Sequence, residues 1–346
     1  MRKNSSILMK SCALVGIGAY FASALLERSA ARKFSLTRKT VVVTGGSRGL
    51  GLVMAREFLH RGANVALLAR DQEEISRACH DLTSQRTRFS SKNVLGLRCD
   101  VTSEGQVSQA MDRIRNVFGS IDVLINNAGH ISVGPMQSMT KEDYQNSLET
   151  HFWGAFYTTS AVLPEMRARR SGRIVNISSI GGKISVPHLL PYCVGKFALA
   201  GFSEGLRSEL RGDNVMVSTI YPGLMRTGSP RNATFKGNHR SEYAWFSLSD
   251  ALPGTSISAE RAARQIVDAC VRGNARLVVS LPAKIVVKTN ELFPEAAAAV
   301  LGLANRMLPQ SGQQKAFYGY DSSSSISPSW ATALNEKAAA NNNEVA

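Results

Sequence analysis

Cysteine is scarce in this sequence, and its few copies follow no disulfide or metal-binding pattern. There are 5 cysteines in 346 residues, and no Cys-x-x-Cys pair or cluster of Cys and His is present. This excludes a disulfide-stapled scaffold and a cysteine-based zinc centre. We therefore expect no metal site, and free thiols in a reducing compartment, at Cys12, Cys79, Cys99, Cys193 and Cys270.

Acidic residues are also few: 26 Asp and Glu stand against 41 Lys and Arg, for a formal net charge of +15. Much of the excess lies in residues 1–40, where eight basic residues face the single acid Glu27. A nucleic-acid surface would instead spread basic residues along a groove with aromatic residues between them. We therefore expect no nucleic-acid partner. Basic residues that flank an apolar stretch indicate a membrane surface.

The N-terminal apolar stretch falls short of the roughly 20 residues that a bilayer-spanning helix needs. Residues 11–26 carry no charge, and Ile7–Met9 lengthen the stretch if the Lys10 side chain reaches the membrane surface. Three interpretations are open: a transmembrane or monotopic anchor, a signal peptide cleaved near Ala22–Ala24, and an amphipathic or soluble helix. We favour an anchor with a basic linker over residues 1–37. The more basic flank, Arg28–Lys39, then places the main domain of a membrane-associated protein on the cytoplasmic side.

From Lys39 onward, short runs of Val, Ile and Leu alternate with longer mixed segments. The runs do not alternate polar with apolar residues, which is typical of parallel strands covered on both faces. The segments between them are long enough for crossover helices. We predict an α/β fold with a single doubly wound Rossmann-type domain over residues 38–309 and a seven-stranded parallel sheet. The predicted strands are Thr40–Thr44, Asn64–Ala69, Val94–Cys99, Ile121–Ile125, Arg173–Ser178, Asn214–Ile220 and Arg276–Ser280.

The last part of the chain has a different composition. Residues 310–346 contain a run of serines and a run of Ala and Asn, from which we predict a disordered tail. Before the tail, Glu295–Met307 predicts a helix with an Ala- and Leu-rich face. Such a face packs on its own domain or on a second copy of the chain in a homo-oligomer. A membrane-contacting surface is the alternative.

A glycine-rich turn follows the first predicted strand. It reads Thr44-Gly45-Gly46-Ser47-Arg48-Gly49-Leu50-Gly51, and a helix is predicted after it from Leu52 to His60. Glycines are needed where the chain turns sharply and where backbone N–H groups approach a pyrophosphate. A turn between a strand and a helix indicates dinucleotide binding, although the spacing here is Gly-x-x-x-Gly-x-Gly.

The charges around this turn discriminate between the two nicotinamide cofactors. An NAD-binding unit has an acidic residue at the end of its second strand, about 20 residues beyond the turn, for the ribose hydroxyls. Here the second strand ends at Ala69 and Arg70 follows, while Arg48 lies within the turn. Two guanidinium groups suit a 2′-phosphate, so we predict NADP as the cofactor. The alternative is that Arg70 pairs only with Asp71 or solvent.

Ser178 and Ser179 end the fifth predicted strand, and Tyr192 and Lys196 follow on one face of a predicted helix. A tyrosine with an ordinary pKa of about 10 is a poor base at neutral pH. A neighbouring ammonium group lowers that pKa because it favours the phenolate. A serine at the carboxyl end of a parallel strand lies where α/β sheets bind ligands. The four residues therefore indicate a site that holds a substrate oxygen and exchanges a proton with it.

In this order the motifs resemble those of the short-chain dehydrogenase/reductase family, of the type with a Thr-Gly-x-x-x-Gly-x-Gly turn and a Tyr-x-x-x-Lys pair. The likeness extends from about Lys39 to Ser280. It includes three further motifs, each directly after a predicted strand: Asp100-Val101, Asn126-Asn127-Ala128-Gly129, and Pro222-Gly223 with Thr227.

The resemblance implies an NADP(H)-dependent oxidoreductase that interconverts a carbonyl and an alcohol. Tyr192 is then the general acid in reduction and the base in oxidation, and Lys196 lowers its pKa and holds the nicotinamide ribose. Ser179 binds the substrate oxygen, whereas Ser178 stands one residue too far from Tyr192. The implied cofactor-binding residues are Gly45, Ser47, Arg48, Gly49, Leu50, Gly51, Arg70, Asp100, Val101, Asn127, Ala128, Gly129, Tyr192, Lys196, Pro222, Gly223 and Thr227.

One position departs from the family pattern. The family has an asparagine in the helix after the fourth strand, where it holds a water in a proton relay to the lysine. The matching segment here is His151-Phe152-Trp153-Gly154. Histidine also donates, accepts and shuttles protons, so we predict that His151 serves the relay. The alternative is a packed histidine in a protein whose relay is lost or rerouted.

Aromatic residues in the segment after Thr227 indicate the kind of substrate. Phe235, Tyr243, Trp245 and Phe246 lie where the family builds its substrate lid, which favours a lipophilic small molecule. These side chains could equally pack on the domain. A different class of function also stays open: a membrane-tethered NADPH-binding scaffold or sensor with little or no turnover. The departure at His151 favours that alternative, and the intact Ser179, Tyr192 and Lys196 argue against it.

Overall fold

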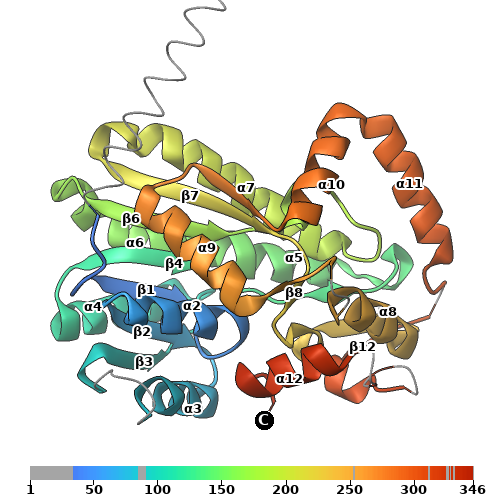
Figure 1. The fold of residues 1–346 in the computed structure, drawn as a ribbon, viewed down its shortest axis with the longest axis horizontal. Coiled ribbons are helices and arrows are strands. Elements are labelled where there is room, and N and C mark those ends of the chain that lie inside the picture. Colours follow the sequence, from blue (N-terminus) through green and yellow to red (C-terminus); the bar gives the residue numbers. More distant parts are fainter. Residues whose placement is uncertain are drawn as a thin grey trace, which may run out of the picture.

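The computed structural model describes residues 34–84, 91–251, 254–310, 312–324, 327, 329 and 332–345. Its centre is a seven-stranded parallel sheet with the strand order β11-β7-β6-β4-β1-β2-β3 (Figure 1). All seven predicted strands are present, each within two residues of its predicted ends. They are β1 (Thr40–Thr44), β2 (Asn64–Ala69), β3 (Val94–Arg98), β4 (Ile121–Asn126), β6 (Gly172–Ile177), β7 (Val215–Pro222) and β11 (Arg276–Val279).

The central strands are buried on both faces, as their composition predicts. Successive residues of β1 point to opposite sides: Val41 and Val43 join one apolar core, and Val42 joins the other. Both cores are closed by helices, so no strand face of β1 meets water. This two-sided burial is the physical reason that these strands read as continuous apolar runs.

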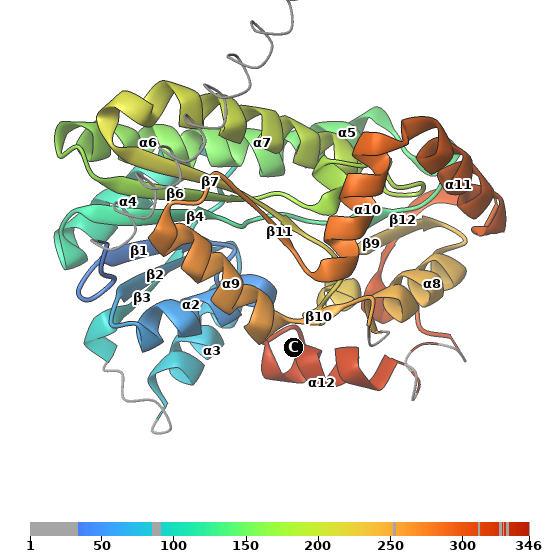
Figure 2. The same ribbon diagram turned by 45° about the horizontal axis from the view of Figure 1, so that its top comes forward.

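Helices cover each face of the sheet (Figures 1 and 2). One core contains residues of α2 (Gly49–His60), α3 (Gln72–Thr83) and α9 (Ala259–Arg272). On the opposite face lie α4 (Glu104–Phe118), α5 (Lys141–Leu148), α6 (Gly154–Ala168) and α7 (Leu190–Glu209). The crossover order and the parallel pairing make this a Rossmann-type sheet, whose carboxyl edge is the expected ligand edge.

Side chains near the helix ends explain where several of these helices begin. Asp71 caps α3, because its carboxylate accepts hydrogen bonds from the backbone N–H groups of Glu73 and Glu74. Ser258 caps α9 in the same way. Between α5 and α6 the chain forms a π-helical turn over Glu149–Trp153, a rare geometry that is frequent at functional sites.

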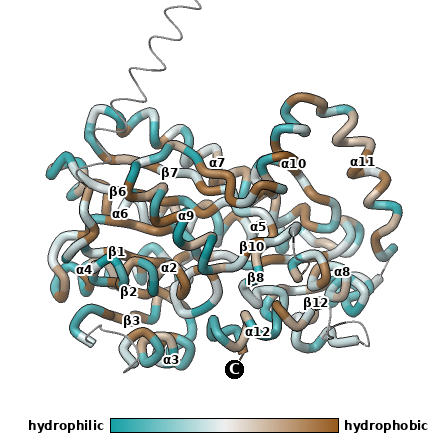
Figure 3. Tube along the Cα trace, in the orientation of Figure 1, coloured by the Kyte–Doolittle hydropathy of each residue, from teal (hydrophilic) through white to brown (hydrophobic). Residues whose placement is uncertain are grey.

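A smaller layer covers the carboxyl edge of the sheet. It consists of α8 (His239–Ala251), the sheet β5 (Ser132–Val133), β9 (Thr234–Gly237) and β12 (Gln313–Tyr318), and the pair β8 (Met225–Arg226) and β10 (Ile257–Ser258). Helices α10 (Leu281–Leu292) and α11 (Pro294–Met307) project away from this layer (Figure 1). The predicted helix at 295–307 is therefore present as α11, and Figure 3 shows its largely apolar composition.

The prediction of a disordered tail over residues 310–346 is wrong for the part of it that the structure describes. Strand β12 pairs with β9, and α12 (Ala333–Asn341) packs against α8. Alanine is the strongest helix former, so an Ala-rich tail becomes helical once a surface is available to it. Asn335 provides one attachment, because its side-chain amide donates to the Ser247 carbonyl at 3.1 Å. Composition alone does not reveal that surface.

The predicted anchor at residues 1–37 lies almost entirely outside the described residues, which begin at Phe34. Among the helices of the described ranges, none combines the length and the apolar character needed to cross a membrane.

Candidate active site

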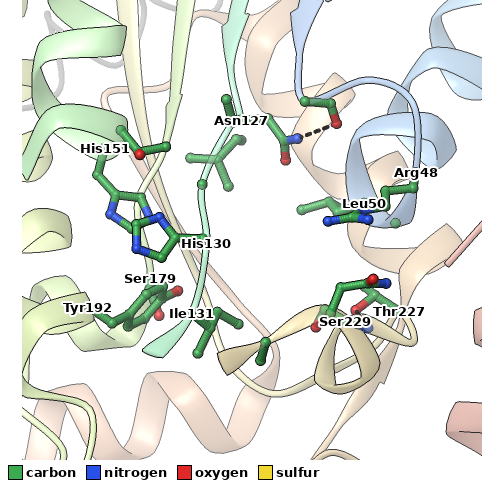
Figure 4. Close-up of a pocket in the computed structure, with 18 of the residues that line it drawn as sticks. Arg48, Leu50, Asn127, His130, Ile131, His151, Ser179, Tyr192, Thr227 and Ser229 are labelled. Atoms are coloured by element: carbon green, nitrogen blue, oxygen red, sulfur yellow. Dashed lines mark hydrogen bonds between the residues drawn. The ribbon is translucent and has the colours of Figure 1, made fainter. Parts of the chain in front are cut away.

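A cavity of about 1460 Å³ opens at the carboxyl edge of the sheet. Figure 4 shows Arg48 and Leu50 on one of its sides and His151, Ser179 and Tyr192 on the other. Of the residues predicted for catalysis or cofactor binding, Gly51 alone does not line it. The predicted residues that do are Gly45, Ser47, Arg48, Gly49, Leu50, Arg70, Asp100, Val101, Asn127, Ala128, Gly129, His151, Ser179, Tyr192, Lys196, Pro222, Gly223 and Thr227.

The glycine-rich turn owes its shape to close backbone approaches. Gly45 and Gly49 have φ angles of +61° and +55°, which favour glycine. A Cβ atom on Gly51 would lie 2.1 Å from the carbonyl oxygen of Gly45, so Gly51 brings α2 against the turn instead of facing the cavity. The Asn127 side chain braces the turn because its amide donates to the carbonyl oxygens of Thr44 and Gly45, each at 3.1 Å.

The two arginines predicted to bind a 2′-phosphate have different surroundings. Arg48 pairs with Glu74, with 2.7 Å between Nη1 and Oε1, and the Ser47 hydroxyl donates to the other oxygen of Glu74 at 2.9 Å. Arg70 lines the cavity and forms no ion pair with any described residue. Asp71 caps α3, as described above, so the alternative pairing of Arg70 with Asp71 is not found. Arg70 therefore presents a guanidinium group to the cavity.

Ser179, Tyr192 and Lys196 meet at the other end of the cavity. Ser179 and Tyr192 lie side by side, since a Cβ atom on Gly181 would be 3.4 Å from Ser179 Oγ and 3.2 Å from Tyr192 Cε1. Lys196 Nζ lies 5.6 Å from the centre of the Tyr192 ring. Lys196 donates to the Ile177 carbonyl at 2.8 Å, which holds its ammonium group at the end of β6. The Ser178 hydroxyl instead donates to the Lys196 carbonyl at 2.9 Å, so it is committed to fastening α7.

Burial is the main influence on the pKa values of Tyr192 and Lys196. It raises the pKa of Tyr192, and the hydrogen bond from Ser179 opposes that rise only in part. It lowers the pKa of Lys196 to about 7. Lys196 is not among the groups that shift the pKa of Tyr192 here, so the lowering of that pKa by Lys196 stays a prediction.

His151 lies in the π-helical turn and is fully enclosed, with 1% of its surface exposed. Its Nδ1 is 3.0 Å from the Ser147 carbonyl oxygen and 3.1 Å from the Ser147 hydroxyl. We assign the proton to Nδ1, because the carbonyl oxygen can only accept and the hydroxyl can accept as well. Burial holds the pKa of His151 well below its ordinary value, which keeps the ring neutral and makes Nε2 an acceptor. Nε2 has no hydrogen-bond partner among the described residues.

Gly129 leaves open the space beside that free nitrogen. A Cβ atom on Gly129 would lie 2.7 Å from His151 Nε2 and 3.5 Å from Lys196 Nζ. Both nitrogens therefore border one small space that any larger residue would fill. The structure thus brings His151 next to Lys196, as a relay requires.

The sequence matches the model of the short chain dehydrogenase family over residues 39–236. The chain belongs to the short-chain dehydrogenase family. It is 32% identical over 256 residues to dehydrogenase/reductase SDR family member 7B of Rattus norvegicus, an alignment that covers 73% of this chain and 76% of that protein. Oxidoreductase BOA17 of Botryotinia fuckeliana is 36% identical over 185 residues, which are 54% of this chain and 65% of that protein, or slightly less than two thirds of it.

Solved structures agree with this assignment. A short-chain dehydrogenase from Streptomyces avermitilis superposes with a TM-score of 0.65 at 26% identity, covering 78% of this chain and 98% of that one. Enzymes of this family use nicotinamide nucleotides, so the chain is a short-chain dehydrogenase with an NAD(P)-type site. The comparisons leave the choice between NAD and NADP open.

Residues 342–344, which follow α12, lie against the glycine-rich turn of this dehydrogenase. The backbone N–H of Gly49, at the start of α2, donates to the Asn342 carbonyl at 2.9 Å. The side-chain amide of Asn343 donates to the carbonyl oxygens of Ser47 at 2.9 Å and Glu74 at 3.0 Å. These contacts occupy the backbone groups of the glycine-rich turn.

The Glu344 carboxylate completes this arrangement. It accepts a hydrogen bond from the Asn232 amide at 2.6 Å, lies 3.5 Å from Arg48 Nε, and would collide with any side chain at Gly49. A carboxylate is thus held where the N-terminus of α2 and a guanidinium group meet, which is the chemistry that binds a phosphate. The residues present therefore fit the nucleotide that the family uses.

His130, Asp250 and Glu344 are among the residues that line this cavity but were not predicted from the sequence. The His130 ring stacks on His151, with 5.6 Å between ring centres. Its place directly after Asn127-Ala128-Gly129 could have indicated it. Asp250 and Glu344 reach the cavity only through the packing of α8 and α12, for which the sequence carries no motif.

Proposed function

We propose that this short-chain dehydrogenase interconverts a carbonyl and an alcohol with NADP(H), and that Tyr192 exchanges the proton with the substrate oxygen. The contact of Tyr192 with Ser179 beside Lys196, at the closed end of the cavity, carries the proposal. A bound nicotinamide nucleotide supplies or accepts the hydride. The direct test is oxidation of NADPH in the presence of a panel of ketones, followed by absorbance.

Each residue has a defined task in this proposal. Ser179 and Tyr192 hydrogen-bond the substrate oxygen, and in reduction Tyr192 donates its hydroxyl proton to that oxygen. Lys196 stands beside Tyr192 and stabilises the phenolate that remains. His151 Nε2 accepts a hydrogen bond across the space beside Gly129 and so positions the proton donor from which Lys196, and through it Tyr192, is reprotonated. Two features support the relay: the neutral ring of His151 and its unpartnered Nε2.

Arg48 and Arg70 should set the preference for NADPH. A charge-assisted hydrogen bond to a phosphate contributes about 1.5–3 kcal/mol, so we expect Arg70→Ala to lower kcat/KM for NADPH by about tenfold. The efficiency with NADH should stay within about twofold, because NADH lacks the 2′-phosphate. Arg98→Ala, at the exposed end of β3, is the matched control. Equal efficiencies of NADPH and NADH in the unaltered enzyme would overturn the NADP assignment.

His151 should affect turnover and not nucleotide binding. We expect His151→Ala to lower kcat by about tenfold at neutral pH, because the proton route to Tyr192 is cut. His151→Asn, which restores the residue type of the resembling family, should recover most of the loss. The dissociation constant of NADPH should be the same in both variants. Full turnover of His151→Ala at every pH would show that the histidine only packs.

The substrate end of the cavity has apolar walls. Trp245 and Phe246 line it, together with Val186 and Leu189. Phe235 and Tyr243 belong instead to a buried aromatic cluster under α8, so two of the four lid aromatics only pack. The two cavity-lining aromatics support a small-molecule substrate with a lipophilic part. Membrane association, a cytoplasmic orientation and homo-oligomer formation stay predictions from the sequence.

A further inference from the structure

Helix α8 carries two buried carboxylates with opposite surroundings. Glu242 is fully buried, and its oxygens accept hydrogen bonds from His188 Nδ1 at 2.8 Å and Trp245 Nε1 at 2.6 Å. Asp250, two turns further along, is 5% exposed. Its carboxylate forms no hydrogen bond and no ion pair with any residue in the described part of the chain. Glu242 therefore links α8 to His188 through a hydrogen bond, whereas Asp250 forms no such link.

A buried carboxylate without a partner is costly. Removing a carboxylate from water destabilises the folded protein unless hydrogen bonds or a counter-charge replace the water. Desolvation raises the pKa of Asp250 to about 8, with no partner to offset it. Asp250 and Tyr192 line the same cavity, and the negative charge of Asp250 contributes to the raised pKa of Tyr192. Nothing in the fold of α8 requires an acid at this position.

Four residues of α8 line the cavity, Trp245, Phe246, Ser249 and Asp250, and Asp250 alone among them has an unpaired polar side chain. Trp245 and Phe246 present rings, and Val186 and Leu189 present aliphatic side chains. The neighbouring Ser249 hydroxyl donates to the Trp245 carbonyl at 2.8 Å, so it is already used within the helix. A substrate that reaches this wall from Tyr192 therefore meets an apolar surface with a single carboxyl group in it.

We propose that Asp250 binds a hydroxyl group of the substrate, so that the enzyme acts on hydroxylated carbonyl compounds in preference to plain hydrocarbon ketones. A hydroxyl donates to the ionised carboxylate and accepts from the protonated one, so it pairs with Asp250 in either state. The apolar walls bind the carbon skeleton, and Asp250 fixes its orientation relative to Tyr192. This inference rests on the proposed function, since it concerns the substrate of that same site.

The test compares matched ketones that differ by one hydroxyl group. The pairs are benzylacetone with its para-hydroxyl analogue, and androsterone with the analogue that lacks its hydroxyl. We expect the enzyme to prefer the hydroxylated member of at least one pair by about tenfold in kcat/KM, mainly through KM, since a site that pairs a substrate hydroxyl discriminates against its absence. Asp250→Leu should abolish the preference, so that the two members of each pair have equal kcat/KM. Asp250→Asn, which can still pair with a hydroxyl, should keep part of the preference.

Two results would overturn the inference: no preference in either pair, or a preference that Asp250→Leu retains. If neither pair is reduced although NADPH binds, the proposed function fails and Asp250 is tested by binding alone. Thermal unfolding with NADPH and each ketone should then show greater stabilisation by the hydroxylated members. Equal stabilisation in the unaltered protein and in Asp250→Leu would reject the role of Asp250.

Discussion

Removal of residues 342–346 is expected to tighten NADPH binding by between about 10- and 100-fold. In the full chain Asn342, Asn343 and Glu344 occupy the backbone groups and the anion position of the glycine-rich turn. A nucleotide that uses the same groups binds only the fraction of molecules whose tail has left, and its apparent affinity falls by that fraction. A tail held by about 1.4–2.8 kcal/mol would produce a change of that size.

Nucleotide binding can be measured here without any substrate, from the fluorescence of NADPH titrated with protein. Glu344→Ala should give part of the gain, because it removes the carboxylate and leaves the Asn342 and Asn343 contacts. Lys337→Ala changes an exposed residue of α12, the helix that precedes these residues, and serves as the control. Truncation that leaves NADPH affinity unchanged, or weakens it, would show that the tail does not compete with the nucleotide.

The effect of truncation should also depend on pH. Burial raises the pKa of Glu344 to about 7, and Arg48 and Asn232 oppose that rise only in part. The bound tail therefore holds a proton that a released, solvated Glu344 gives up. Because the bound form takes up more protons, the tail binds less tightly as pH rises toward 7. The gain on truncation should accordingly be larger at about pH 6 than at about pH 8.

Replacing Tyr192 with Phe is expected to lower kcat by about a thousandfold, within the range usual for loss of a general acid. The ring stays, so the walls of the cavity are kept, and only the hydroxyl that contacts Ser179 is lost. The dissociation constant of NADPH should change by less than about twofold, since Tyr192→Phe removes one of many contacts along the nucleotide.

A second buried tyrosine provides the control for that experiment. Tyr221 is fully buried, and its hydroxyl donates to Glu204 at 2.7 Å, so Tyr221→Phe also removes a bonded hydroxyl. This variant should lose stability but keep kcat. If Tyr192→Phe retains turnover, or if both variants lose it equally, Tyr192 is not the proton donor.

The parts of the site that sequence could predict are contiguous in the chain. The turn from Thr44 to Gly51 lies within eight residues, and the spacing of Tyr192 and Lys196 places them on one helix face. The strands could be predicted because burial on both faces leaves an unbroken apolar run. These features can be recognised without knowing which distant segments of the chain contact each other.

The remaining features depend on contacts between distant segments. Glu344 reaches Arg48 only because α12 finds a surface on α8, and Ala- and Asn-rich composition does not specify that contact. The four-residue spacing places Lys196 beside Tyr192, but it does not show how deeply the fold buries the two side chains. The direction of the pKa shift of Tyr192 therefore had to come from the structure.

In the proposed reaction a hydride moves between a nicotinamide nucleotide and a substrate carbon, and Tyr192 exchanges the proton with the substrate oxygen. The most direct measurement supplies NADPH deuterated at the hydride position, together with the ketones named above, and locates deuterium in the products by mass spectrometry. We predict an alcohol with one deuterium on its carbinol carbon from the unaltered enzyme, and about a thousandfold less from Tyr192→Phe. Bound NADPH with no deuterated alcohol from any ketone, or equal labelling by both proteins, would contradict this proposal.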